Sequence, residues 1–125
     1  MTLVLDSGAL IALDRNERAM WARLKAAHQS RQIPVTHAGV VGQVWRGHPR
    51  QARLALALRG IDLKALDEHL GRAAGVLLGA AGLADVIDAA VVLIAKDGDD
   101  IITTDPADIS QLATTADRHV EVIRP

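Results

Sequence analysis

Asp85-Val-Ile-Asp88-Ala-Ala-Val-Val-Leu-Ile-Ala95, followed after a short polar turn by Ile101-Ile-Thr-Thr-Asp105, is the stretch that decides the fold. Its first part predicts a helix to about Ala95 that is apolar on nearly every side and therefore buried. Its second part predicts a short buried strand. A buried helix leading into a buried strand is typical of an α/β protein, in which helices cover both faces of a parallel sheet.

The rest of the chain continues this alternation. Strands are predicted over residues 2–5, 33–36, 61–63, 101–104 and 120–123. Helices are predicted over residues 8–13, 16–28, 38–45, 50–58, 67–78, 85–95 and 106–112. Ser7 is expected to cap the first helix, and residues 79–83 are expected to form a glycine-bearing loop. The predicted architecture is a three-layer α/β/α fold with a central, mostly parallel sheet flanked by helices.

Length and composition restrict the kind of protein. A chain of 125 residues predicts one domain, residues 1–125. The absence of cysteine excludes disulfides and thiolate chemistry and fits a reducing cytoplasm. The first residues lack the basic and apolar regions of a signal peptide, and no apolar run approaches the ~20 residues that span a bilayer. We therefore expect a cytoplasmic protein without a membrane segment.

Three aspartates stand at the ends of buried elements. Asp6 follows the first strand, Asp88 enters the apolar helix, and Asp105 follows the strand at 101–104. The carboxyl ends of parallel strands share one sheet edge, where α/β proteins bind ligands. An unpaired buried carboxylate is unfavourable, so convergent acids indicate a divalent cation with oxygen ligands. Mg²⁺ or Mn²⁺ fits best because no soft ligand is present.

Net charge is −1, with 14 Lys+Arg against 15 Asp+Glu, which is unlike a dedicated nucleic-acid binder. The distribution is uneven, however. Arg46, Arg50 and Arg53, followed by Arg59, form a basic stretch without an acid, whereas residues 85–108 are acidic. A basic rim beside an acidic cleft suits an enzyme that binds metal and phosphate together. Arginines that merely keep a helix surface hydrated give the same pattern.

At these residues the chain resembles the PIN domain, and in particular the small VapC-type toxins of prokaryotic toxin-antitoxin pairs. The resemblance extends over the whole chain. It rests on three segments, Leu3-Val-Leu-Asp6-Ser-Gly-Ala-Leu-Ile-Ala-Leu13, Leu83-Ala-Asp85-Val-Ile-Asp88-Ala-Ala and Ile102-Thr-Thr-Asp105-Pro-Ala-Asp108-Ile. It implies a metal-dependent endoribonuclease in which Asp6, Asp88 and Asp105 hold Mg²⁺ or Mn²⁺, which activates water against an RNA phosphodiester.

Other residues near these acids are candidates for supporting roles. Asp85 lies on nearly the same helical face as Asp88, where it can supply a further ligand or simply begin the helix. Ser7, Thr103 and Thr104 can orient ligand waters or serve only as cap and strand residues. Asp108 is interpreted as a cap or turn residue rather than a ligand, and Asp99 and Asp100 are assigned to an exposed loop. The histidines lack zinc spacing, and only His37 is of interest.

Gln43 departs from the family pattern, which commonly has a glutamate in the helix after the second strand. An amide keeps an oxygen ligand but loses the charge that holds the ion. One hypothesis is that Asp85 supplies the missing charge. An alternative is a catalytically weakened PIN module that binds RNA or antitoxin without efficient cleavage. A haloacid-dehalogenase phosphatase fits less well, because it requires an acid where Gly8 stands, and a phospho-receiver lacks its acid pair and lysine.

The resemblance also implies partners. They are an RNA substrate, a cognate antitoxin protein and a second copy in a homodimer. Because Trp21 and Trp45 are the only aromatic residues apart from histidine, RNA should be held by arginine on phosphate rather than by stacking. Arg46, Arg50 and Arg53 are the candidates, and the tryptophans are expected in the core or an interface. An apolar groove near helices 10–24 and 40–58 is expected to receive the antitoxin.

Overall fold

The five strands form one parallel sheet in the order β3-β2-β1-β4-β5. The structure is a computed structural model that describes all residues 1–125. The strands are β1 (Leu3–Leu5), β2 (Val35–His37), β3 (Asp62–Lys64), β4 (Asp100–Ile102) and β5 (Glu121–Ile123). Every neighbouring pair runs parallel. The α/β class is therefore confirmed, and the sheet is wholly rather than mostly parallel.

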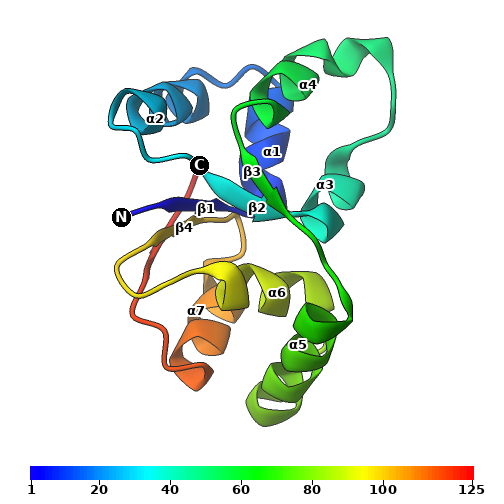
Figure 1. Cartoon of the computed structure of the whole chain (residues 1–125), viewed down its shortest axis with the longest axis vertical. Coiled ribbons are helices and arrows are strands. Elements are labelled where there is room, and N and C mark those ends of the chain that lie inside the picture. Colours follow the sequence, from blue (N-terminus) through cyan, green and yellow to red (C-terminus); the bar gives the residue numbers. More distant parts are fainter.

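Helices cover the two faces of this sheet as separate layers (Figure 1). One layer consists of α1 (Ser7–Asp14), α2 (Arg18–Gln29), α3 (Ala38–Val44) and α4 (Ala52–Leu58). The other consists of α5 (Glu68–Ala81), α6 (Val86–Ile94) and α7 (Pro106–Thr115). Helix α1 packs against α2, α3 and α4, while α5, α6 and α7 pack against one another. This is the predicted three-layer α/β/α arrangement.

The core lies where the central strands meet helices α1 and α6. Leu5, Ile101 and Ile102 are fully buried, and so are the four residues 89–92 of α6. A helical stretch that is apolar on every side is stable in such a place because all four residues are removed from water. In the register of β1 and β4, Leu5 pairs with Ile102. The residues that follow these two strands therefore leave the sheet side by side.

Two predicted helix ends differ from the structure. Asp6, not Ser7, caps α1, since its Oδ1 accepts a hydrogen bond of 2.8 Å from the backbone N–H of Ser7. The predicted loop at 79–83 is wrong, because α5 continues to Ala81 and ends at Gly82, whose φ is +70°. Among the glycines of this segment, only Gly82 adopts the left-handed conformation that favours glycine, so those before it remain helical.

The assignment of Asp99 and Asp100 to an exposed loop is also wrong, since each side chain is 8 % exposed. Asp99 accepts hydrogen bonds from the backbone N–H groups of Thr2, at 3.0 Å, and Lys96, at 2.9 Å. It thereby ties the start of β1 to the turn before β4. Burial, with the charges of Glu121 and Asp99, raises the pKa of Asp100.

Smaller differences concern the boundaries of other elements. A 3₁₀ turn over Pro49–Gln51 precedes α4, where one continuous helix was predicted. The second and fourth strands are shorter or shifted by one to two residues, as is usual at element ends. No single helix is long and apolar enough to cross a membrane; only α5 and α6 taken together reach that length and composition, and they are bent by 107° relative to each other.

Candidate metal centre

Three carboxylates converge at the carboxyl edge of the sheet. Asp88, Asp105 and Asp108 each offer one oxygen, and these oxygens lie within 4.8 Å of one another. Asp88 is in the first turn of α6, Asp105 immediately precedes α7, and Asp108 is in the first turn of α7. Because α6 and α7 pack together on one face of the sheet, their N-terminal turns bring the three acids to one point.

The side chain of Asp105 is free to bind a ligand. Although Asp105 occupies the position before α7 that normally caps a helix, its carboxylate makes no capping hydrogen bond. The aspartates before α1, α5 and α6, in contrast, all accept capping bonds from backbone N–H groups. An exposed carboxylate without such a bond keeps its lone pairs for water or a cation.

Asp6 lies beside this cluster but is held by the protein itself. Its side chain is 3 % exposed. Oδ1 caps α1 through Ser7 N–H, and Oδ2 accepts a hydrogen bond of 2.7 Å from the hydroxyl of Thr103. The charge of Asp6 is nevertheless close enough to act on both Asp88 and His37. The sequence-predicted trio is thus found at one edge, with Asp6 fixed and Asp88 and Asp105 grouped with Asp108.

Thr103 forms hydrogen bonds to two of the acids, contacts that were not predicted. The fully buried hydroxyl donates to Asp6 and accepts a hydrogen bond of 3.0 Å from the backbone N–H of Asp105. One hydroxyl therefore joins the end of β1 to the turn before α7. The arrangement uses both the donor and an acceptor site of the threonine.

The electrostatics of the site concentrate on Asp88. Burial is the largest factor that raises its pKa, and the negative charges of Asp6, Asp85, Asp105 and Asp108 add to it, so that the pKa of Asp88 reaches about 7. No cationic side chain is among these influences. A group of negative charges held together without a cation from the chain favours the binding of one from solution.

The donor set fits a hard divalent cation. Ligands opposite each other around Mg²⁺ are about 4.2 Å apart, twice a metal–oxygen distance of about 2.1 Å. The three carboxylate oxygens lie within 4.8 Å of one another, which is comparable to that separation. Every donor in the group is a carboxylate oxygen, so the group could hold a metal ion that accepts oxygen ligands.

Asp85 has the role of a helix cap. Its Oδ1 accepts hydrogen bonds from the N–H groups of Ile87, at 2.9 Å, and Asp88, at 3.2 Å. The side chain is exposed and lies outside the group of three carboxylates. Asp85 therefore orients the turn that carries Asp88 and adds negative charge near it.

Asp108 lies in the first turn of α7, as predicted, but it is also a member of the group that could hold a metal, which the sequence interpretation did not expect. It was assigned to a cap or turn, yet its carboxylate joins those of Asp88 and Asp105. The available signal was its spacing, because residues three apart in a helix lie on the same side. Asp105, as the residue before α7, places Asp108 one turn further along the face that already carries an acid.

The other candidate residues are more distant from the three carboxylates. Gln43 is exposed and is not one of the group that can hold a metal. Ser7 contributes its backbone N–H to Asp6 rather than the cap that was predicted. Thr104 is exposed, and its side chain stands against Gly8, where an added Cβ would lie 2.5 Å from Cγ2 of Thr104. Gly8 thus allows α1 to approach the turn that leads to Asp105.

His37 is buried where the two helical layers meet. Its Nδ1 accepts a hydrogen bond of 3.1 Å from Gly39 N–H at the start of α3, and its Nε2 lies 3.0 Å from the carbonyl oxygen of Ile87 in α6. These partners define a neutral ring with the proton on Nε2. Burial lowers the pKa of His37, which favours this neutral form. The ring connects α3 to the turn that carries Asp88.

The predicted RNA-binding arginines lie on the surface, but their guanidinium groups are not equally free to bind a ligand. The guanidinium of Arg46 donates to the carbonyls of Gly42, Gln43 and Trp45 and so caps the end of α3. Arg50 and Arg53 are exposed and take part in none of the three ion pairs of the chain. Of the tryptophans, Trp21 packs on the core and Trp45 is 38 % exposed.

No protein-family model, no curated protein and no solved structure matches this chain. The converging carboxylates of Asp88, Asp105 and Asp108 are therefore the feature of the chain that bears on its function.

Proposed function

We propose that this chain is a metal-dependent endoribonuclease of the PIN-domain type that acts as the toxin of a toxin-antitoxin pair. The observation that carries the proposal is the convergence of the Asp88, Asp105 and Asp108 carboxylates at the carboxyl edge of the sheet, with Asp6 beside them. A phosphodiester cannot approach such a cluster of negative charge without a cation. Metal-assisted phosphodiester hydrolysis needs both the carboxylates and the cation that they hold.

Each residue has a distinct task in this proposal. Asp88, Asp105 and Asp108 hold Mg²⁺ or Mn²⁺, with Asp6 contributing charge from behind them. Thr103 fixes the carboxylate of Asp6 and the backbone of Asp105 relative to each other. When bound, the metal lowers the pKa of a coordinated water and balances charge on the phosphate. In the metal-free chain the pKa of Asp88 is about 7, so near neutral pH the metal displaces a proton from this carboxylate when it binds.

RNA cleavage under defined metal conditions tests the proposal. Purified total RNA is incubated with the protein in EDTA, in Mg²⁺ and in Mn²⁺, and the fragments are resolved on a denaturing gel. We expect cleavage only with metal, and we expect Asp88→Asn and Asp105→Asn to lower the rate by at least a hundredfold. Asp67→Asn is the matched control, since Asp67 is an exposed cap of α5 and asparagine caps equally well.

Intact RNA under every metal condition, with a folded protein, would contradict the nuclease. If such a protein still binds RNA or a neutralising partner, the weakened PIN module becomes the better description. Gln43 is then the residue to change, and cleavage by the Gln43→Glu variant would identify the missing charge as the cause.

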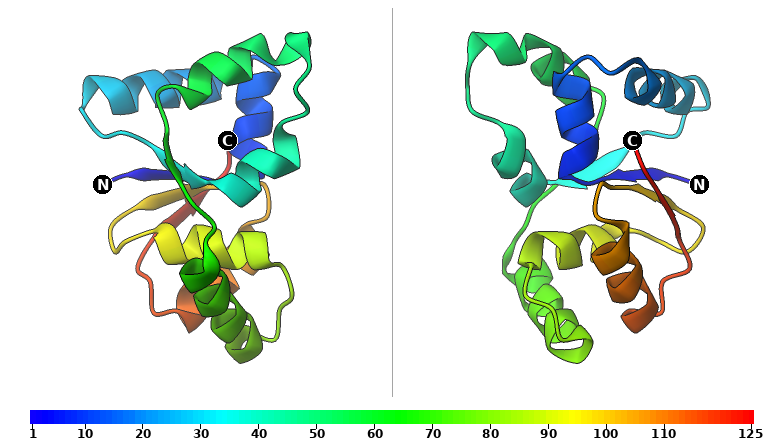
Figure 2. Two further views of the ribbon diagram at one scale, coloured as in Figure 1. Left: turned by 45° about the vertical axis from the view of Figure 1, so that its right-hand side comes forward. Right: turned by 180° about the vertical axis from the view of Figure 1, so that it is seen from behind.

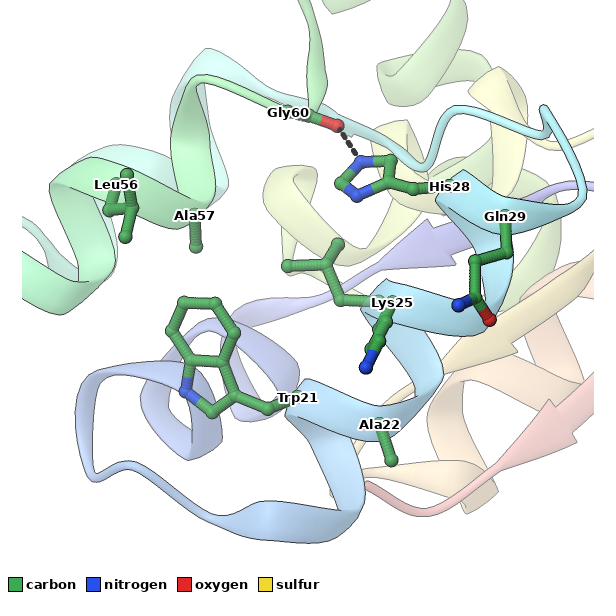
Figure 3. A pocket seen from close by; sticks show the side chains of 9 residues that line it. Trp21, Ala22, Lys25, His28, Gln29, Leu56, Ala57 and Gly60 are labelled. Carbon is green, nitrogen blue, oxygen red and sulfur yellow. Dashed lines mark hydrogen bonds between the residues drawn. The ribbon is translucent and has the colours of Figure 1, made fainter.

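The proposed antitoxin has a fitting surface between α2 and α4 (Figure 3). A hollow of about 690 Å³ lies there, lined mainly by apolar atoms of residues 21–29 and 56–60. The ring of Trp21 and the side chains of Leu56 and Ala57 face it, and Lys25 stands at its border. Leu56 is 62 % exposed. An amphipathic helix with an apolar anchor and acidic flanks would cover this surface.

A variant with a charge in this hollow tests the partner. We expect Leu56→Asp to abolish neutralisation by the co-encoded partner and to leave RNA cleavage unchanged, because the hollow is remote from the three carboxylates in sequence and helical layer. Val76→Asp is the control, since Val76 is 77 % exposed on α5 in the other layer. The proposed homodimer is checked in the same preparation by sedimentation analysis of the free chain.

A further inference from the structure

A second hollow, of about 420 Å³, runs beside α1. Gly8, Ile11, Ala12 and Arg15 line one of its sides. Their spacing of three, four and seven residues places them on one face of α1. Thr104, Arg124 and Pro125 line the opposite side, and Figure 2 shows the end of the chain beside α1 in its right-hand view. The hollow is therefore a groove between a helix and the segment that follows β5.

One end of this groove is formed by residues that lie close in sequence to acids of the candidate metal centre. Gly8 is two residues after Asp6, and Thr104 stands between Thr103 and Asp105. The close contact of Gly8 with the Thr104 side chain forms the end of the groove nearest the acids. From Gly8 to Arg15 the helix rises by about 10 Å, at about 1.5 Å per residue. A ligand in the groove thus extends from the carboxylates along α1.

Two unpaired arginines give the groove positive charge. Arg15 and Arg124 are exposed, and neither takes part in an ion pair. Nη1 of Arg124 lies 3.4 Å from the carbonyl oxygen of Thr104, which holds this guanidinium next to the turn before Asp105. Glu17 is the only acidic side chain in the lining, beside the two arginine side chains. Arg46, by comparison, uses its guanidinium on three backbone carbonyls.

We propose that this groove is the subsite for a phosphate group of the nucleic-acid strand adjacent to the one that reacts at the carboxylates, with Arg15 and Arg124 as its ligands. The inference rests on the proposed nuclease function. It adds the path of the nucleic-acid strand, which then runs from the acids along α1. Guanidinium groups suit this task, since they bind phosphate oxygens in pairs and remain charged at every relevant pH. Arg46, Arg50 and Arg53 are then not the main phosphate contacts.

The salt dependence of RNA binding tests this subsite. The Asp88→Asn protein, which lacks cleavage in the proposed function, is titrated in Mg²⁺ with a labelled single-stranded RNA oligonucleotide at several salt concentrations. Each phosphate contact contributes about 0.7 to the slope of log affinity against log salt for a single strand. We expect Arg15→Gln and Arg124→Gln each to reduce the slope by about that amount, and the double variant by about 1.4.

Matched variants separate this effect from a general change of charge or fold. Arg31→Gln removes one charge from an exposed arginine that lies outside the groove and in no ion pair, and it is expected to leave the slope unchanged. Arg53→Gln tests the alternative that the predicted basic stretch holds the phosphate. Arg124→Lys keeps the charge and is expected to retain most of the slope. Thermal melting shows whether each variant is folded. If Arg53→Gln lowered the slope while Arg15→Gln and Arg124→Gln left it unchanged, the proposed subsite would be overturned.

The result is independent of the cleavage assay on the unmodified chain. If that chain cleaves RNA in metal but the Arg15 and Arg124 variants bind as the parent does, the subsite fails and the nuclease stands. If the Asp88→Asn protein binds no RNA and the unmodified chain cleaves none, both proposals fail. Cleavage together with the expected loss of slope supports both.

Discussion

The hydroxyl of Thr103 donates a hydrogen bond of 2.7 Å to Oδ2 of Asp6, although the two residues are 97 positions apart in the sequence. Both are buried, with exposed fractions of 0 % and 3 %. The same hydroxyl accepts the backbone N–H of Asp105 at 3.0 Å. One oxygen atom therefore fixes the residues after β1 relative to those after β4, and the positions of the Asp6 and Asp105 carboxylates depend on it.

The first prediction concerns the Thr103→Val variant, which keeps the shape of the side chain and removes the hydroxyl. Asp6 Oδ2 and Asp105 N–H then lose their partner in a buried environment, which costs about 1–3 kcal/mol. We expect the free energy of unfolding to fall by about this amount and the affinity for Mn²⁺ to fall with it. Urea denaturation and calorimetric titration with Mn²⁺ measure the two effects.

Two further variants serve as controls for that result. Thr103→Ser retains the hydroxyl and is expected to restore Mn²⁺ affinity. Thr115→Val removes an exposed hydroxyl that donates to the Gln111 carbonyl, and surface changes of this kind alter stability by less than about 0.5 kcal/mol. Mn²⁺ affinity that is equal in the Thr103→Val and unmodified proteins would show that the hydroxyl does not organise the metal site.

The second prediction concerns the pH dependence of metal binding. The pKa of Asp88 is raised from 3.8 to about 7, so at pH 6 a cation must displace its proton. We expect Mn²⁺ affinity to rise by up to about tenfold per pH unit towards pH 7 and then to level off. Titrations at half-unit pH steps between 5.5 and 8 measure this. In Asp88→Asn the remaining affinity should lose that dependence, and a flat profile in the unmodified protein would refute the prediction.

The raised pKa of Asp88 has the opposite effect on the stability of the metal-free protein. Between the unfolded pKa of 3.8 and the folded value of about 7, the folded chain holds a proton on Asp88 that the unfolded chain has released. The free energy of unfolding therefore declines as pH rises through this window. Raising the pH weakens the metal-free fold and strengthens metal binding, so added Mn²⁺ should stabilise the protein most above pH 7.

The third prediction concerns His37, which joins α3 to α6 through Gly39 N–H and the Ile87 carbonyl. His37→Ala removes a helix cap and a buried ring, and we expect a loss of about 2–4 kcal/mol in the free energy of unfolding. His37→Asn should lose less, because its Oδ1 can accept from Gly39 N–H. His48→Ala is the control: His48 caps an exposed turn through Arg50 N–H, and its loss costs about 1 kcal/mol or less.

His37 also contributes to stability in a defined pH range. Burial lowers its pKa below the ordinary value of 6.5, so the folded chain binds this proton later than the unfolded chain as pH falls. The stability due to His37 is complete above pH 6.5 and is lost as pH falls through the lowered pKa. Denaturation of the His37→Asn variant across pH 5–7 should show a weaker dependence than that of the unmodified protein.

The sequence predicted the layers well because burial leaves a strong pattern. The apolar run 89–95 could only be a buried helix or strand, and its length and flanking polar residues selected the helix. Asp6, Asp88 and Asp105 were predicted to meet because parallel strands align their carboxyl ends. The register of Leu5 with Ile102 aligns the strand ends that precede Asp6 and Asp105, whereas Asp88 reaches Asp105 through the packing of α6 on α7.

Details that depend on tertiary contact were not accessible in the same way. Whether a carboxylate caps a helix or stays free cannot be read from its position: Asp85 and Asp105 both precede helices, but only Asp85 makes the capping bonds. Likewise, the burial of Asp99 follows from its bonds to Thr2 and Lys96, one of which spans 97 residues. Such pairings exist only after the sheet has formed.

The last prediction separates the ligand from the cap. Asp108→Asn removes a charge from the group of three carboxylates and is expected to weaken Mn²⁺ binding by about tenfold or more, because each carboxylate strengthens the field on a hard cation. Asp85→Asn removes a charge of the same sign nearby but keeps the cap of α6, since asparagine accepts the same bonds. It should leave the fold intact and change Mn²⁺ affinity by less than threefold. Calorimetric titration of both variants at pH 8, where Asp88 is ionised, compares them directly. If Asp85→Asn weakened binding as much as Asp108→Asn, Asp85 would be a ligand that compensates for Gln43, and its capping bonds would have to give way when the ion binds.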